Sequence, residues 1–303
     1  MPFRFYFYFI VTSLLFLFYP GQHPYFQIIA FNREYFSQQH KTPSISIHPI
    51  PYVNSSSLPS ITAQGSYIVD ISSFTPIYKK NSDSHLFPAS TTKIITALVA
   101  ADIFQPDDVI TVSNVNVEGQ KMDLVEREHI TAENLLYGML VYSGNDAAYA
   151  LANFYGYDEF IVLMNKKAQD LGMKGSFFTN PAGFDDYKQK STAFDLALAG
   201  RALIENPYLR KMVGTKEITI SDTDYSIFHK LTNVNKLLGE IQGLGGLKTG
   251  YTENAGENLV SFYRHNEHDY LIVVMHSEDR FFDTTTLVNW INDNVKYLSI
   301  DSS

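Results

Sequence analysis

The pattern of apolar and polar positions divides the chain into a mainly helical middle with strand-like segments on both sides of it. Runs rich in β-branched and aromatic residues, bounded by turn residues, predict strands at 65–71, 75–80, 217–220, 246–252, 257–264 and 270–277. Apolar residues at helical spacing predict helices at 91–102, 132–142, 145–154, 158–171, 192–204 and 282–294. Strands and helices therefore do not alternate regularly along the chain.

This order predicts an α+β fold and not a doubly wound parallel sheet. We expect one antiparallel sheet built from both ends of the chain and flanked by helices, with a helical lobe inserted between the two groups of strands. The folded body is expected at residues 63–303. Its sheet lobe is expected at about 63–100 and 210–303, and its helical lobe at about 101–209.

The N-terminal pattern indicates export. Arg4 precedes an uncharged apolar run at 5–19, which ends at Pro20-Gly21, so residues 1–21 are typical of a secretory signal. The run is shorter than the roughly 20 residues that span a bilayer. No clear small-x-small cleavage site follows, so a cleaved signal and a retained signal anchor both stay open. Residues 22–62 are rich in Pro and Ser and are interpreted as a linker. We expect a periplasmic or extracytoplasmic protein, with the cytoplasmic membrane as a partner if the segment is retained.

Composition removes several classes of function. The 303 residues include no cysteine, which excludes thiol catalysis and cysteine metal sites. The formal net charge is −9 and no block of Lys or Arg occurs, so nucleic acid is not expected as a partner. His265 and His268 have a spacing that two metal ligands could share, but they are interpreted as solvated turn histidines, and no metal site is expected.

The first candidate for chemistry is the stretch "FPASTTKIITALVA", in which Ser90 and Lys93 lie at a helix start. Three residues apart, they share one helical face. A serine hydroxyl is a weak nucleophile until a neighbouring base takes its proton, and a desolvated lysine can be that base. Taken alone, the stretch is more typical of an ordinary helix start with a surface lysine, because S-x-x-K is common by chance.

Two further motifs change that interpretation. Ser143-Gly144-Asn145 falls at a break between two expected helices, and Lys248-Thr249-Gly250 falls in an expected strand. Separately, the first could be a helix cap and the second an exposed strand. Together, in this order, they correspond to the S-x-x-K, S-D-N and K-T-G set that is typical of penicillin-binding proteins and class A β-lactamases, with S-G-N in place of S-D-N.

The region from about residue 66 to 291 resembles the D-alanyl-D-alanine carboxypeptidases, which are low-molecular-weight penicillin-binding proteins. Besides the three motifs, the blocks at 160–184, 191–203 and 231–238 are similar to that family. The resemblance implies a penicillin-binding-protein/β-lactamase-like fold. It also implies a serine-type enzyme without a cofactor that removes the terminal D-alanine from peptidoglycan stem pentapeptides, with β-lactam antibiotics as inhibitors.

The resemblance implies a role for each motif residue. Ser90 would be the acylated nucleophile, Lys93 the base for acylation, and Ser143 the relay of the proton to the leaving D-alanine. Asn145 would orient the substrate amide, and Lys248 would supply positive charge near the substrate carboxylate.

The rest of the third motif would complete the substrate site. Thr249 would place a hydroxyl near the terminal carboxylate, and Gly250 would allow a close approach of backbones. The backbone N–H groups of Ser90 and Tyr251 would form the oxyanion hole. Many relatives carry a histidine where this chain has Tyr251. Arg280 is a weaker candidate for carboxylate recognition, and a surface ion pair is its alternative.

Other functions remain alternatives. An endopeptidase acting on peptidoglycan cross-links would share every motif, and a non-catalytic peptidoglycan-binding protein would not need all three to be intact. A class A-like β-lactamase would need a glutamate in an E-x-x-L-N loop, but the interval around Glu205 reads "IENPYLRKM". Relatives often continue into a β-rich C-terminal domain and an anchoring helix. Neither is expected here, so any tether is expected at the N-terminus.

Overall fold

The computed structural model describes residues 2–18, 49–54, 57–114 and 116–298, which belong to two units, 1–47 and 48–303. In the first unit the described residues form helix α1 (Pro2–Phe18). Among the described residues, no helix is both long enough and apolar enough to cross a membrane. The end of the expected signal segment and the expected linker up to residue 48 lie outside the described residues.

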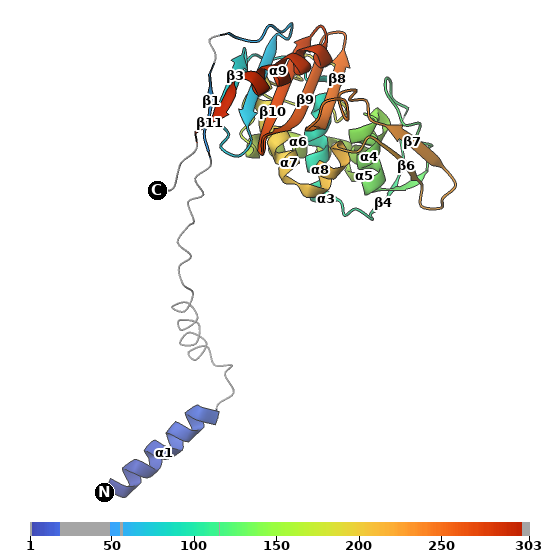
Figure 1. Cartoon of the computed structure of the whole chain (residues 1–303). Coiled ribbons are helices and arrows are strands. Elements are labelled where there is room, and N and C mark those ends of the chain that lie inside the picture. Colours follow the sequence, from blue (N-terminus) through green and yellow to red (C-terminus); the bar gives the residue numbers. More distant parts are fainter. Residues whose placement is uncertain (1, 19–48, 55–56, 115, 299–303) are drawn as a thin grey trace. The chain divides into compact units, whose positions relative to one another are not determined.

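The body is organised around one five-stranded antiparallel sheet, as the sequence predicts (Figure 1). In spatial order its strands are β3 (Pro76–Lys80), β2 (Gly65–Asp70), β10 (His268–Ser277), β9 (Gly256–His265) and β8 (Leu244–Thr252). The sheet thus combines strands from both ends of the chain. Between β9 and β10, Asn266 and Glu267 have φ of 48° and 66°, the left-handed conformation that a tight two-residue hairpin needs. Strand β8 forms one edge of the sheet.

Both faces of the sheet are covered. Along β2, Tyr67 and Val69 belong to the larger core and the intervening Ile68 to a smaller one, because successive side chains of a strand point to opposite faces. Helix α9 (Arg280–Asn294) packs on the face of the smaller core (Figure 1). Helix α7 (Ala193–Glu205) contacts β2 and β10 on the other face. This two-sided burial makes all six residues of β2 buried.

The helices in the middle of the chain confirm the expected ones within a few residues. A 3-10 turn at Ala89–Thr92 leads into α3, and the helices are α3 (Lys93–Ile103), α4 (Ala132–Val141), α5 (Asn145–Tyr155), α6 (Tyr157–Asp170) and α7. Helix α8 (Pro207–Val213) is not among the helices that the sequence predicts. The Asn206 side chain accepts from two backbone N–H groups and Pro207 occupies the first turn, so the same pair starts a new helix.

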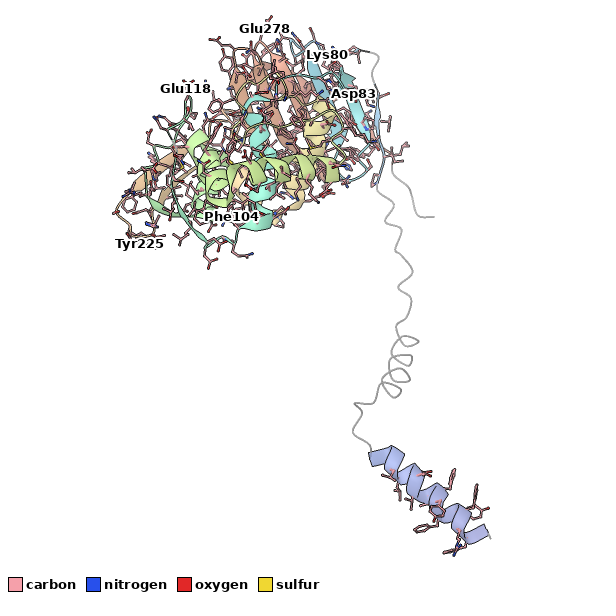
Figure 2. All side chains as sticks on the ribbon, turned by 180° about the vertical axis from the view of Figure 1, so that it is seen from behind. Lys80, Asp83, Phe104, Glu118, Tyr225 and Glu278 are labelled. Carbon is pink, nitrogen blue, oxygen red and sulfur yellow. The ribbon has the colours of Figure 1, made fainter. Side chains whose placement is uncertain are left out.

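Two small hairpins complete the helical region. Strand β4 (Val109–Thr111) pairs with β5 (His129–Thr131), and β6 (Glu217–Ser221) pairs with β7 (Phe228–Thr232). The expected strand at 217–220 therefore does not join the main sheet, but lies in a hairpin that packs against α4. Tyr225 marks the tip of this hairpin in Figure 2.

The last part of the expected linker is bound to the body. Strand β1 (Pro51–Val53) pairs with β11 (Val295–Tyr297), so this part of the expected linker, before the expected boundary at residue 63, belongs to the body. The Trp290 indole N–H donates to the Ser57 carbonyl at 2.9 Å. Asp283 is fully buried and accepts from Thr62 N at 3.0 Å, Thr62 Oγ1 at 2.8 Å, Ala63 N at 2.8 Å and Ser277 Oγ at 2.6 Å. Through Asp283, helix α9 holds the chain as it enters the sheet.

Replacing Asp283 with alanine should lower the free energy of unfolding by about 2–4 kcal/mol, because these donors lose a charged acceptor. Urea unfolding of the full chain measures the change. Asp293→Ala, at an exposed position of the same helix, is the control and should change it by less than about 0.5 kcal/mol. Equal effects of the two substitutions would contradict a special role of Asp283.

Candidate functional site

Ser90 lies in the 3-10 turn before α3, and a second loop supports this turn from behind. Ala89 adopts φ of 46°, a left-handed conformation that is rare for residues other than glycine. Gly183, at φ of 93°, packs so tightly here that a Cβ added to it would lie 1.8 Å from the Ala89 carbonyl oxygen. The loop around residue 183 therefore fixes the backbone that presents Ser90.

The amine of Lys93 lies in a completely buried position beside Ser90. Its Nζ is 2.8 Å from Ser90 Oγ, and it donates to Asn145 Oδ1 at 2.7 Å and to the Ala182 carbonyl at 2.8 Å. Two of these neighbours can only accept, whereas the hydroxyl can also donate. A neutral amine has two N–H groups and one lone pair, so the arrangement fits an uncharged Lys93 whose lone pair faces the Ser90 hydroxyl.

The pKa of Lys93 agrees with this geometry. Burial lowers the pKa of Lys93 from 10.5 to about 7, although the negative charge of Asp146 acts in the opposite direction. Lys93 can thus lose its proton near neutral pH. A base of this strength next to a serine hydroxyl is the arrangement that nucleophilic catalysis requires.

The connection between α4 and α5 places Ser143 and Asn145 on the site. Ser143 adopts φ of 65°, and the Gly144 N–H donates to the Gly138 carbonyl at 3.0 Å, which closes the tight connection. Asn145 donates its Nδ2 to the Glu118 carbonyl at 2.8 Å. That contact determines which end of the amide faces Lys93, so Asn145 presents its oxygen to the amine.

Strand β8 brings a second buried lysine to the site. Lys248 is 1 % exposed, and its Nζ donates to Ser143 Oγ at 2.8 Å and to the Thr249 carbonyl at 2.9 Å. Burial lowers the pKa of Lys248 well below 10.5, and the charges of Lys93 and Arg280 lower it further. Thr249 is also buried, at 4 % exposed. The second and third motifs are therefore joined directly, through Ser143 and Lys248.

Gly250 makes the contact between the edge strand and the nucleophile turn. A Cβ added to Gly250 would lie 2.9 Å from Ser90 N and 3.1 Å from the Pro88 carbonyl oxygen. A larger residue would push β8 away from Ser90. The glycine thus brings the backbone of the third motif against that of the first.

Tyr251 and Arg280, the last two sequence candidates, have different surroundings. The side chain of Tyr251 is 61 % exposed, next to Gly250. The Arg280 side chain is 15 % exposed and donates Nη1 to the Gly250 carbonyl at 2.8 Å, while its Nε lies 3.9 Å from a carboxylate oxygen of Glu257. Among the described residues Arg280 Nε finds no hydrogen-bond partner. Arg280 is therefore mostly buried next to Gly250 and forms a long ion pair with the partly exposed Glu257, so both interpretations of this residue stay open.

Several functional contacts were missed in the sequence. The Ala182 carbonyl belongs to the block at 160–184, which resembles the family but was assigned no role, and the Glu118 carbonyl belongs to a loop without a motif. A backbone carbonyl has no sequence signature of its own. Figure 2 labels Glu118 on its loop. Asp146 is 1 % exposed and accepts from Met122 N and Leu124 N, each at 3.1 Å. Its position directly after Asn145 was the available signal.

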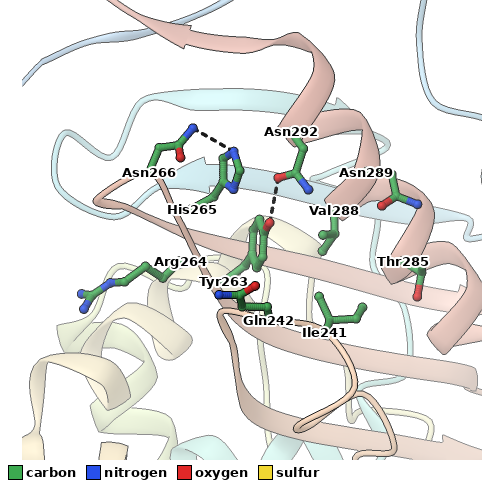
Figure 3. A pocket seen from close by; sticks show the side chains of 10 residues that line it. All are labelled: Ile241, Gln242, Tyr263, Arg264, His265, Asn266, Thr285, Val288, Asn289 and Asn292. Atoms are coloured by element: carbon green, nitrogen blue, oxygen red, sulfur yellow. Dashed lines mark hydrogen bonds between the residues drawn. The ribbon is translucent and has the colours of Figure 1, made fainter.

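The two histidines considered for metal binding lie away from these contacts. His265 and His268 flank the turn between β9 and β10. The ring of His265 stacks on Tyr263, and that of His268 stacks on Tyr297. His265 also lines a surface pocket of about 500 Å³ next to α9, in which Tyr263 donates to Asn292 at 2.7 Å (Figure 3). No residue of the three motifs lines this pocket.

Comparison with known proteins gives consistent matches over most of the body. The family model for D-alanyl-D-alanine carboxypeptidases matches residues 52–279. The chain is 34% identical over 202 residues to the D-alanyl-D-alanine carboxypeptidase DacF of Bacillus subtilis, covering 64% of this chain and 52% of that protein. It is 32% identical over 253 residues to DacC of Escherichia coli, covering 77% and 62%. The matched region thus spans between about half and two thirds of the length of these relatives.

Solved structures give the same result. The Streptomyces K15 DD-transpeptidase superposes with a TM-score of 0.73 at 29% identity, covering 77% of this chain and 98% of that one. The D-alanyl-D-alanine carboxypeptidase DacD of Francisella tularensis superposes with a TM-score of 0.71 at 27% identity, covering 77% and 71%. The expected fold, that of the penicillin-binding proteins, is therefore confirmed.

Gly183→Ala should destabilise the body and displace Ser90, because the new Cβ would overlap the Ala89 carbonyl. Gly172→Ala is a matched control: Gly172 also has positive φ, at 79°, but nothing lies within 4 Å of an added Cβ. Both variants carry the backbone cost of about 1–2 kcal/mol. Urea unfolding should show a clearly larger loss for Gly183→Ala, and equal losses would contradict the close packing behind Ser90.

Proposed function

Since the chain belongs to the family of D-alanyl-D-alanine carboxypeptidases, we propose that it removes the terminal D-alanine from peptidoglycan stem pentapeptides through an acyl-enzyme on Ser90. β-Lactams acylate the same serine. One observation carries the proposal: the Nζ of the fully buried Lys93 lies 2.8 Å from Ser90 Oγ, and its other two contacts are carbonyl oxygens. This is a lysine arranged to accept the proton of the serine.

In the first step Lys93 takes the proton of Ser90, whose oxygen bonds to the carbonyl carbon of the penultimate D-alanine. The negative charge that develops on the carbonyl oxygen is stabilised by the backbone N–H groups of Ser90 and Tyr251. The packing of Gly250 against Ser90 N supports this pairing, because it holds β8 beside the nucleophile. Asn145 orients the substrate amide.

In the second step the C–N bond breaks, and the proton from Lys93 passes through Ser143 to the leaving amine of D-alanine. The contact of Lys248 with Ser143 Oγ, at 2.8 Å, supports this role because it orients the hydroxyl. Water then attacks the ester and loses a proton to Lys93. The bond between the acyl carbon and Ser90 Oγ breaks, Lys93 returns the proton to Ser90 Oγ, and the shortened peptide leaves as a carboxylic acid.

Recognition of the substrate carboxylate is assigned to Lys248, Thr249 and Arg280. The Arg280 guanidinium is mostly buried and donates Nη1 to the Gly250 carbonyl at 2.8 Å, and this place beside the third motif supports the assignment. Because Lys248 bonds to Ser143 and Arg280 to the Gly250 carbonyl, these two basic side chains would favour peptides that end in a free carboxylate close to the bond that is cut.

Export to the compartment of this substrate is assigned to residues 1–21, as a cleaved signal or as an anchor in the cytoplasmic membrane. Helix α1 lies in this segment and carries Arg4 as its only charged residue, which supports the assignment. The catalytic domain comprises residues 63–303, and the strand at Pro51–Val53 adds to it from the linker side.

Rival chemistries differ mainly in what they require at the acyl-enzyme. A class A-like β-lactamase would need a glutamate that holds the deacylating water. Glu205 instead forms an ion pair with Arg201 at 2.9 Å, and its side chain is 58% exposed at the end of α7. An endopeptidase or a DD-transpeptidase, the activity named for the Streptomyces K15 protein, would use the same serine. An endopeptidase differs from a carboxypeptidase in the group that leaves when the peptide bond breaks. A transpeptidase differs in the acceptor of the acyl group, which is an amine where a hydrolase uses water.

Incubating the purified full chain with a fluorescent penicillin should label it, and Ser90→Ala should abolish the label. With a pentapeptide, free D-alanine should appear and Ser90→Ala should reduce its release by more than about 10³-fold. Cross-linked dimers and an added amine acceptor, assayed in parallel, would reveal an endopeptidase or a transpeptidase. Serine-independent labelling, or none, would contradict the proposal. Rapid penicillin hydrolysis without D-alanine release would favour a β-lactamase.

The rate constant of penicillin acylation should rise with pH through about 7, because burial lowers the pKa of Lys93 to about 7 and only the neutral amine can take the serine proton. Stopped-flow labelling across pH measures this limb. Lys93→Arg, whose guanidinium stays protonated, should lose the limb together with nearly all labelling. If the acylation rate constant of wild type rose only around pH 10, near the pKa of an exposed lysine, this role of Lys93 would be contradicted.

A further inference from the structure

A buried histidine–glutamate pair, His229 and Glu128, contacts the loop that precedes β5 (His129–Thr131). The side chains of His229, on β7, and Glu128 are 5% and 0% exposed. His229 Nε2 lies 2.9 Å from Glu128 Oε1, and its Nδ1 lies 2.8 Å from the Met122 carbonyl oxygen. The second oxygen of Glu128 accepts from Val125 N at 2.9 Å. Neither residue takes part in the proposed reaction.

The two contacts of the imidazole determine its protonation state. A carbonyl oxygen and a carboxylate oxygen both accept hydrogen bonds, so each ring nitrogen of His229 needs a proton to satisfy its neighbour. The pair therefore fits an imidazolium bonded to a carboxylate. Burial alone would lower the pKa of His229, but the hydrogen bond and charge of Glu128, with the Met122 carbonyl, raise it above 6.5.

Other ionisable groups around His229 are few among the described residues. Asp146, in the first turn of α5, contributes a further negative charge that raises the pKa of His229. On β6 the residue opposite His229 is Ile220. Helix α4 also packs against β7, and its ionisable residues are Glu133 and Tyr137. The ion pair with Glu128 is thus the dominant interaction of the charged ring.

The loop held by this pair also holds the candidate active site. Met122, whose carbonyl faces His229, donates its N–H to Asp146. Only a few residues earlier, the carbonyls of Glu118 and Gln120 accept from the side chain and the backbone N–H of Asn145, both at 2.8 Å. Asn145 in turn accepts from Lys93. Hydrogen bonds and the short stretches of backbone between them therefore connect His229 to the base beside Ser90.

We propose that the His229–Glu128 ion pair is a positioning device, which fixes the loop at 118–124 so that Asn145 holds Lys93 against Ser90. The inference rests on the proposed function for its kinetic consequence. A neutral imidazole has one N–H, so loss of the proton leaves either Met122 or Glu128 facing a ring lone pair. Because the folded-state pKa is raised, the contribution of the pair is complete below about pH 6.5 and is lost as pH rises through the folded-state pKa.

The experiment measures penicillin acylation of the full chain against pH, with ring-nitrogen NMR of His229 assigned by the loss of its signals in His229→Gln. Wild type should show both ring nitrogens protonated at neutral pH, and its acylation should fall at alkaline pH as they titrate. His229→Gln should slow acylation by about 10- to 100-fold, because small misplacements of a catalytic group cost up to this much. The alkaline fall should disappear in that variant.

His129→Gln, at an exposed histidine of the neighbouring strand β5, is the matched control and should acylate as wild type does. The isosteric substitution Glu128→Gln removes the negative charge with little change of volume. It serves as the test variant if His229→Gln does not fold. Glu128→Gln should lower the acylation rate constant, and the decrease of this rate constant at alkaline pH should begin at a lower pH than in wild type. Its effect should lie in the acylation rate constant and not in the affinity for penicillin, whereas general destabilisation would lower the labelled fraction alone.

A neutral tautomer of His229 at neutral pH would overturn the inference. The inference would also be overturned if His229→Gln and Glu128→Gln were acylated as fast as wild type, since the loop would then be held without the ion pair. Failure of wild type itself to label at Ser90 would instead overturn the proposed function. In that case the NMR titration still decides whether the ion pair exists, so the two failures are distinguishable.

Discussion

The interaction on which the site depends is the burial of two lysine amines, Lys93 and Lys248, among oxygen atoms that carry no charge. Their hydrogen-bond partners in the described body are hydroxyls, an amide oxygen and backbone carbonyls. A buried cation without a paired anion is costly, so the protein favours loss of a proton from this pair near neutral pH. Desolvation in the core thus gives Lys93 the unprotonated amine that can accept the proton of a serine nucleophile.

This environment exists only because three chain segments come very close together. Gly250 allows β8 to touch the turn of Ser90, and Gly183 allows a third loop to press on the same turn. The sheet that carries β8 is in turn held by strands from both ends of the chain, and Asp283 ties the incoming segment to α9. Residues far from the candidate site therefore determine how completely Lys93 and Lys248 are shielded from solvent.

The family comparison and the geometry support each other at different levels. The match over residues 52–279 places the chain among the D-alanyl-D-alanine carboxypeptidases, and the contacts explain how its particular residues would perform such chemistry. The geometry also adds a contribution that no motif contains. Carbonyls of the loop at 118–124 orient Asn145, and the buried His229–Glu128 pair contacts the Met122 carbonyl of the same loop.

The sequence by itself determined the identity and order of the motif residues, the antiparallel sheet built from both ends, and the main helices, because these depend on local periodicity and short-range spacing. It did not determine the hairpin of β6 and β7, or helix α8, where Asn206-Pro207 both ends one helix and starts the next. Tertiary structure alone decided that Lys248 bonds to Ser143, 105 residues away, and that Lys93 bonds to the Ala182 carbonyl, 89 residues away. Any residue type can supply a backbone carbonyl, and burial is a property of the packed chain. The protonation of Lys93 and His229 could therefore be inferred only once the fold had brought their neighbours together.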